Sequence, residues 1–261
     1  AAGAAIATVI GQWVAAILAL FFNLRCNPDV DLALKYLKPD KQIIKPVLTV
    51  GVPSIIMNSI SSVMNFSINQ ILMGFGDVVG TTATGVFSIY YKLQSFFFMP
   101  LFGLNNATIS VVAFNYGARR PDRITKTLRF AVGAALVFMI AGLLVFELLP
   151  GALLGIFELS NSFVAMGTRA LQIIALHFPI AAVCIALGAS FQGLGNGIYS
   201  TITSLCRQMI ALLPAAYLLS LSGNVDMVWW AFPIAELVSL MATLFFFLRI
   251  YRQKIKPMYP A

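Results

Sequence analysis

Stretches of about 20 consecutive apolar residues recur along the whole chain, and they limit its possible folds more than any other feature. Each stretch can cross a hydrocarbon layer about 30 Å thick, because an α-helix rises about 1.5 Å per residue. The 261 residues are 60% hydrophobic and only 10% charged, and their mean hydropathy is +0.90. A water-soluble domain typically has about 25% charged residues. We therefore predict an integral membrane protein.

The apolar stretches are long and apolar on nearly all faces, unlike the short alternating segments of outer-membrane barrels. The sequence therefore predicts an all-α integral membrane protein with about seven transmembrane helices. We expect the helices at residues 1–24, 46–74, 82–115, 127–149, 170–194, 199–221 and 227–249. Prolines inside these spans favour bends. They are Pro53, Pro100, Pro179, Pro214 and Pro233.

Lysine and arginine are concentrated in alternate loops, after the first, third and last predicted helices. The segments immediately around Asp77, Glu158 and Asp226 carry neither residue type. By the positive-inside rule, the basic loops and the C-terminus face the cytoplasm of a multi-pass cell-membrane protein. The net charge of +8 then pairs with anionic head groups of the lipid bilayer, so a nucleic-acid partner is not expected.

The domain organisation follows from the same pattern. We predict a single transmembrane helix at residues 1–24, a cytoplasmic basic linker at 25–45 and six transmembrane helices at 46–261. The chain opens at Ala1 with neither a methionine nor a basic region before its apolar stretch, so we expect further sequence upstream.

Polar residues form a stripe on the second predicted helix. Ser54, Asn58, Ser62, Asn65 and Asn69 follow one another at steps of four or three, which places them on one helix face. Turned toward lipid without partners, such groups cost several kcal/mol each, so they must face protein or water. They either hydrogen-bond between helices as structural contacts or form the wall of a substrate path.

The third predicted helix carries Lys92 about 15 Å from its outer end, close to the middle of the bilayer. A lysine at that depth needs a partner or water, which makes it a candidate functional residue. Tyr91, Gln94, Phe98 and Asn105 recur around it at helical spacing.

Other ionisable residues in the spans have alternative interpretations. Lys92 can pair with Glu147 or Glu236 to fix two helices together, or these carboxyls can be interfacial or neutral through burial. His177, the only histidine, can carry a coupled proton or be simply hydrogen-bonded. Arg207 is interpreted as reaching the inner interface by snorkelling.

No motif of a soluble enzyme is present. The chain has no Gly-Lys-Ser/Thr phosphate loop, no His-Glu-x-x-His and no Gly-x-Ser-x-Gly, and its three cysteines have no paired spacing. We therefore expect neither an enzyme nor a cofactor or metal site, and any energy for transport must come from an ion gradient or from another protein.

Three segments resemble the C-terminal lobe of the multidrug and toxic compound extrusion (MATE) family. They are Gly51–Gln70 (GVPSIIMNSISSVMNFSINQ), Gly85–Arg120 (GVFSIYYKLQSFFFMPLFGLNNATISVVAFNYGARR) and Ala189–Gly197 (ASFQGLGNG). The opening GAAIATVIGQ is similar to that family's sixth helix. The resemblance covers nearly the whole chain, and the block around Pro100 with its terminal Asn-Tyr-Gly-Ala is its most specific part.

The resemblance implies twelve helices in two lobes and export of drugs or organic cations in exchange for sodium or protons. This chain would supply helices six to twelve, with residues 1–24 ending the first lobe, and its partners would be the missing N-terminal lobe and a small-molecule substrate. The expected substrate cavity is formed by residues of the second, third and fifth predicted helices. They are Asn58, Ser61, Ser62, Asn65, Asn69, Tyr91, Lys92, Gln94, Phe98, Asn105 and His177.

The coupling ion is expected to bind elsewhere. Sodium-coupled members often carry carboxylates where this chain has Ser61 and Ala181, so the site is expected in the first lobe, as in members similar to DNA-damage-inducible transporters. Two alternatives stay open. A flippase for lipid-linked oligosaccharides shares the helical plan but needs several cationic cavity residues, and a non-transporting membrane scaffold would use the polar stripe only to hold helices together.

Overall fold

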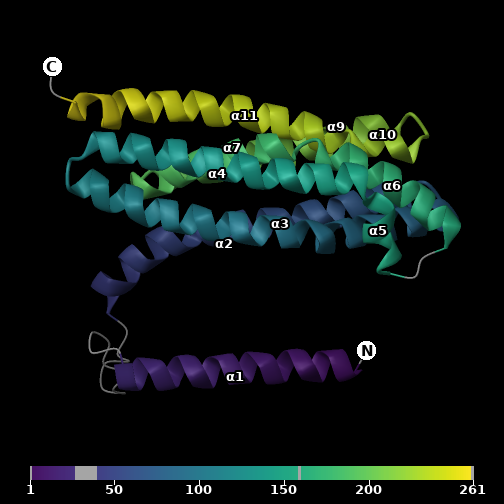
Figure 1. Cartoon of the computed structure of the whole chain (residues 1–261), viewed down its shortest axis with the longest axis horizontal. Helices are drawn as coiled ribbons and strands as arrows, with labels where there is room; N and C mark the ends of the chain where they lie inside the picture. The colour runs from purple at the N-terminus through teal and green to yellow at the C-terminus, as the bar shows by residue number, and fades with distance from the viewer. Residues whose placement is uncertain (1, 27–39, 158–159, 260–261) are drawn as a thin grey trace. The chain divides into compact units, whose positions relative to one another are not determined.

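A computed structural model describes residues 2–26, 40–157 and 160–259 (Figure 1). All regular elements in these ranges are helices and none is a strand, which confirms the predicted all-α fold. The chain divides into two units, Ala1–Thr49 and Val50–Ala261.

The first unit contains α1 (Ala2–Cys26) and the beginning of α2 (Lys41–Met73). Residues 6–26 of α1 are long and apolar enough to cross a membrane, in agreement with the first predicted span. The predicted basic linker at 25–45 falls mainly on residues 27–39, which lie outside the described ranges.

The second unit contains the rest of α2 and the helices that follow it, which run alongside one another in Figure 1. The long helices are α3 (Asp77–Gly117), α4 (Pro121–Leu148), α7 (Phe178–Gly193) and α11 (Ala231–Ile250). The shorter ones are α5 (Pro150–Gly155), α6 (Asn161–Ala175), α8 (Gly197–Leu205), α9 (Leu213–Ser220) and α10 (Val225–Trp229). Two π-helical turns, η2 (Cys206–Leu212) and η3 (Tyr251–Ile255), and a 3₁₀ turn, η4 (Lys256–Met258), complete it.

Among the described residues, five helices are long and apolar enough to cross a membrane, or six if the bent pair α6 and α7 counts as one span. They coincide with six of the seven predicted spans. The remaining predicted span coincides with α2, a 33-residue helix that is not among these six and whose side chains are only partly described before Ser59.

Two breaks in the helices lie beside prolines. The axes of α6 and α7 differ by 44°, and the break comes just before Pro179, which has no N–H to continue the helix. Pro214 stands at the start of α9, directly after the π-helical turn η2, where the regular hydrogen-bond pattern is widened. Pro100, in contrast, lies inside a continuous α3.

Helix α7 packs against α3, α4 and α11. Its buried positions carry mostly small side chains, which let neighbouring backbones approach closely. The small ones are Ala181, Ala182, Ala186, Ala189, Ser190 and Gly193. A methyl group added at Gly193 would lie 3.0 Å from the Ile109 carbonyl oxygen of α3. The close contact of α7 with α3 therefore depends on small residues.

Large apolar side chains cover the outside of the second unit as well as its core. Phe96, Phe114, Phe130 and Val137 are each between 72% and 76% exposed. Soluble proteins rarely expose apolar surface on this scale, so the unit is built for apolar surroundings.

One end of the second unit gathers basic residues. Lys254 of η3 donates to the Leu194 carbonyl oxygen at 2.6 Å and lies 5.6 Å from the centre of the Tyr116 ring. The α3–α4 turn, the α7–α8 turn and η3 therefore share this end. The basic residues of the α3–α4 turn, the beginning of α4, η3 and η4 are Arg119, Arg120, Arg123, Lys126, Arg252, Lys254 and Lys256.

The opposite end carries Asp77, at the start of α3, and Asp226, in α10. Arg169 of α6 also lies at this end, where its Nη1 is 2.9 Å from Asp226 Oδ2. Both side chains are partly exposed to solvent, so this ion pair contributes at most about 1 kcal/mol.

Gly80, in the first turn of α3, packs directly on the end of α2. An added Cβ would lie 2.9 Å from the Leu72 carbonyl oxygen and 2.9 Å from Met73 Cα. We expect Gly80→Ala to lower the free energy of unfolding by about 1–3 kcal/mol, because these backbone atoms cannot easily move aside. Thermal unfolding of the purified protein in detergent measures the change.

Gly133→Ala in α4 is the matched control, because no atom beyond the neighbouring turns of its own helix lies within 4 Å of its added Cβ. It should raise stability by up to about 1 kcal/mol, since alanine favours a helix over glycine. If both variants unfold at the same temperature as the wild type, the close α2–α3 contact is wrong.

Candidate functional site

The second unit encloses a cavity of about 430 Å³, bounded by α2, α3, α7, α8, η2 and α11. Polar side chains of all six segments line it, together with Phe98, Phe102 and Phe232. The polar lining includes Gln94, Asn105, Gln192, Ser200, Ser204, Arg207, Gln208 and Glu236. A polar hollow inside an otherwise apolar helical bundle needs either water or a ligand to solvate it.

The structure places six of the eleven predicted site residues on the wall of this cavity. They are Ser61, Tyr91, Gln94, Phe98, Asn105 and His177. Asn65 and Asn69 are half-buried in α2 but do not line the cavity, and Ser62 is exposed. Asn58 also belongs to α2, and its side chain lies outside the described part of the structure.

Lys92 lies away from the cavity of the second unit. Its side chain is exposed on α3, does not line the cavity and makes no ion pair with any described residue. The pairing of Lys92 with Glu147 or Glu236 is therefore absent from the described structure. Tyr91 and Gln94 do line the cavity. They are three residues apart and share a helix face, whereas Lys92, one residue from Tyr91 and two from Gln94, lies on another face.

Part of the polar stripe on α2 is satisfied within its own helix. The Asn65 side-chain amide donates to the Ser61 carbonyl oxygen at 3.0 Å. This bond meets one donor of the Asn65 amide within α2 itself.

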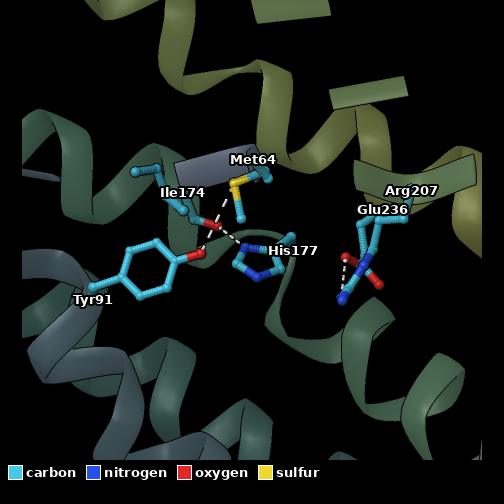
Figure 2. Close-up of polar contacts among 6 residues, drawn as sticks. All are labelled: Met64, Tyr91, Ile174, His177, Arg207 and Glu236. Carbon is cyan, nitrogen blue, oxygen red and sulfur yellow. Dashed lines mark hydrogen bonds and ion pairs between the residues drawn. The ribbon is translucent and has the colours of Figure 1, made fainter. Parts of the chain in front are cut away.

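The main charged feature of the cavity is an ion pair between η2 and α11. Arg207 Nη1 lies 3.4 Å from Glu236 Oε2, and Figure 2 shows the two side chains next to each other. The Arg207 side chain is 30% exposed, whereas that of Glu236 is only 4% exposed. Both residues line the cavity, and Glu236 is the more deeply buried of the two.

The carboxylate of Glu236 is only half satisfied. Oε2 accepts the single contact with Arg207, while Oε1 is buried and has no hydrogen-bond partner among the described residues. Buried carboxylates usually accept several hydrogen bonds, and an unmade one costs about 1–3 kcal/mol or more for a charged group. Among the described residues, Glu236 is therefore held by one contact at 3.4 Å.

Sequence reasoning missed this pair, although it contained a usable signal. Arg207 and Glu236 lie at similar distances before and after the turn at residues 221–224, so two antiparallel helices bring them to the same depth. We interpreted Arg207 as snorkelling, but the π-helical turn η2 directs it toward α11 instead.

His177 stands at the break between α6 and α7, among aromatic rings. Its Nδ1–H donates to the Ile174 carbonyl oxygen, and its ring centre lies 6.1 Å from that of Phe98 and 6.4 Å from that of Phe232. Figure 2 shows it near Tyr91, whose hydroxyl is 3.9 Å from Met64 Sδ. The rings of Phe98, Phe232 and Tyr91 therefore make this side of the cavity aromatic, and His177 is a polar group among them.

No group of three His, Cys, Asp or Glu side chains that could hold a metal ion comes together within the described residues. The lining instead combines aromatic faces, amides, hydroxyls and one ion pair. Such a wall suits reversible binding of a small molecule better than bond-breaking chemistry.

The ion pair between Arg207 and Glu236 should also affect the stability of the protein. Arg207→Gln should lower the free energy of unfolding by about 3 kcal/mol, because it leaves the buried Glu236 without a countercharge. The double variant Arg207→Gln/Glu236→Gln removes both charges and should be more stable than this single variant. Thermal unfolding in detergent measures both, and a double variant less stable than the single one would contradict this pairing.

Comparison with known proteins gives the family. The family model described as MatE matches residues 53–218, which is more than half of the chain. Two similar relatives are the multidrug export proteins MepA of Staphylococcus saprophyticus, 23% identical, and of Staphylococcus aureus strain N315, 22% identical. Each alignment covers 93% of this chain and 52% of the relative, so the chain spans about half the length of the curated relatives it matches.

Solved structures agree in fold. An outward-facing multidrug resistance MATE family transporter of the MOP superfamily aligns with 98% of this chain and 56% of its own, with a TM-score of 0.83 and 22% identity. A MOP superfamily transporter from Pyrococcus furiosus aligns with 99% of this chain and 57% of its own, with a TM-score of 0.83 and 23% identity. The fold and the family model together confirm the resemblance found in the sequence: the chain belongs to the MatE family of membrane transporters.

Proposed function

We propose that this chain forms the C-terminal half of a secondary active exporter, which moves drugs or organic cations out of the cell in exchange for sodium or protons. The observation that carries the proposal is the cavity of about 430 Å³, lined by polar and aromatic groups inside an otherwise apolar bundle. Its volume lies within the range of about 300–1,000 Å³ that small-molecule sites occupy.

The cavity wall fits an organic cation. Tyr91, Phe98 and Phe232 offer aromatic faces and edges, and an aromatic face attracts a cation by about 0.5–2 kcal/mol. Gln94 and Asn105 offer amide oxygens that accept hydrogen bonds from an ammonium group. Arg207 and Glu236 neutralise each other, so the pair presents no net charge that would repel a cation.

A companion lobe completes the proposal. Alternating access requires two units that rock about a site between them, and this chain spans about half the length of its relatives. Ser62 and Lys92 are exposed on α2 and α3 of the second unit. Polar groups turned toward lipid are costly, so an N-terminal lobe or a water-filled space shared with it would solvate them.

The proposed orientation places the basic end of the second unit in the cytoplasm. Arg119, Arg120 and Arg123 lie there together with Lys254 of η3. Anionic lipids of the inner leaflet attract such residues by about 1 kcal/mol each. The C-terminus of this cell-membrane protein is then cytoplasmic.

Two substitutions test the cavity. In the full transporter that contains this chain, Gln94→Ala and Asn105→Ala should each reduce export of a fluorescent organic cation about threefold to tenfold, because each removes a polar contact worth about 1 kcal/mol. Efflux from loaded cells is measured together with the amount of transporter in the membrane.

Thr127→Ala is the matched control, because Thr127 lies on α4 outside the cavity lining and its hydroxyl donates to the Arg123 carbonyl oxygen of its own helix. It should export at the wild-type rate. Unchanged efflux in both cavity variants would contradict the export proposal. A collapse in abundance without a loss of efflux per molecule would support a structural role for these amides instead.

A further inference from the structure

We propose that Glu236 is a proton-binding site of this half, and that the proton it takes up displaces an organic cation from the cavity. The inference rests on the proposed export function; it names the proton as the coupling ion and Glu236 as the residue that binds it. It is carried by the Arg207–Glu236 pair, by the unpartnered Glu236 Oε1 and by the position of the pair on the cavity wall.

The two carboxylate oxygens of Glu236 have different surroundings, and Oε1 is the one that would take the proton. Glu236 Oε2 faces Arg207 at 3.4 Å, whereas Oε1 is buried without a donor. A hydronium ion from the cavity transfers its proton to Oε1, which leaves a water molecule and a neutral carboxyl group. Because Oε1 is buried, the carboxyl group must turn toward the cavity to take up this proton. The contact with Arg207 then loses its charge on one side, while the guanidinium keeps its own charge.

A proton suits this site better than a sodium ion. Sodium would need the carboxylate oxygens as ligands, but the guanidinium of Arg207 already occupies the cationic position beside Oε2. A proton needs only one oxygen and no coordination shell. Arg207 can remain in place while the proton adds to the other oxygen.

Protonation changes the charge of the cavity wall. With Glu236 ionised, the pair is neutral and an organic cation can bind. With Glu236 protonated, the charge of Arg207 is uncompensated, and Arg207, whose side chain is 30% exposed, lines the cavity. Like charges across such a cavity repel, so proton binding weakens cation binding by about tenfold or more. Proton and cation therefore exclude each other, as antiport requires.

The other titratable groups around Glu236 come from several elements. Tyr90 of α3, His177 before α7 and Cys184 of α7 all lie near enough to interact electrostatically with it, as does Arg207 of η2. None of these neighbours is a second carboxylate. Tyr90 Oη is also buried without a partner and lines the same cavity, which adds another polar group to this region.

Proton release on cation binding tests the proposal in the purified full-length transporter. Tetraphenylphosphonium is a suitable probe, because its charge does not titrate and any proton released must come from the protein. In weakly buffered detergent solution with a pH indicator, the wild type should release protons as it binds the probe. Isothermal titration measures the affinity in parallel.

Two variants give opposite expected affinities. Glu236→Gln leaves the positive charge of Arg207 on the cavity wall without a countercharge. The affinity for the probe should therefore fall by about tenfold or more, and binding should release no proton. Arg207→Gln/Glu236→Gln restores a neutral wall, so the probe should bind about as well as in the wild type, again without proton release. Glu147→Gln, in α4 and away from the cavity, is the matched control and should release protons normally.

The outcomes separate this inference from the export function. Normal proton release by the double variant, which retains its fold because no buried charge is stranded, would overturn the role of Glu236. A second outcome would also overturn the role of Glu236 as a proton site. In it, sodium competes with the probe in the wild type, this competition is lost in the double variant, and no proton is released, which would show a sodium site instead. A wild type that does not bind the probe at all would instead contradict binding of organic cations, on which the inference rests.

Discussion

The structure depends on one constraint, which is that polar and charged groups inside the apolar bundle must be solvated. The charges of Arg207 and Glu236 meet across two helices, and the Asn65 amide bonds back to its own helix. Polar side chains of α3, α7 and α8, among them Gln94, Gln192 and Ser204, surround a hollow of about 430 Å³. Because hydrocarbon offers no hydrogen bonds, this hollow is where water or a polar ligand would be held.

Helix packing makes the hollow possible. Small residues on α7 allow close contact with α3 and α4, while the break near Pro179 and the π-helical turn before Pro214 interrupt regular helices beside the cavity. The first break leaves His177 among aromatic rings, and the second directs Arg207 toward α11. Local departures from α-helical geometry thus place the two most distinctive polar groups.

The fold was largely readable from the sequence, because span-length apolar stretches locate helices that must satisfy their own backbone hydrogen bonds. The site was readable only in part. Helical spacing groups Tyr91, Gln94 and Phe98, and all three line the cavity of the second unit. Depth along a helix does not reveal its face, and Lys92 is exposed on α3 outside this cavity, so its place in the substrate cavity of the full transporter stays a prediction. The pairing of Arg207 with Glu236 depends on how two helices meet and on a π-helical turn, which hydropathy does not report.

Transport through the cavity requires that water and substrate reach the interior of this bundle. A single cysteine placed by Ser204→Cys, in the full transporter with its native cysteines replaced, measures this directly, because Ser204 lines the cavity. It should react with a small charged thiol reagent and be protected by excess organic cation, while Phe130→Cys, on the apolar outer surface, should not react. A cysteine at position 204 as unreactive as the one at 130 would contradict a solvated transport cavity.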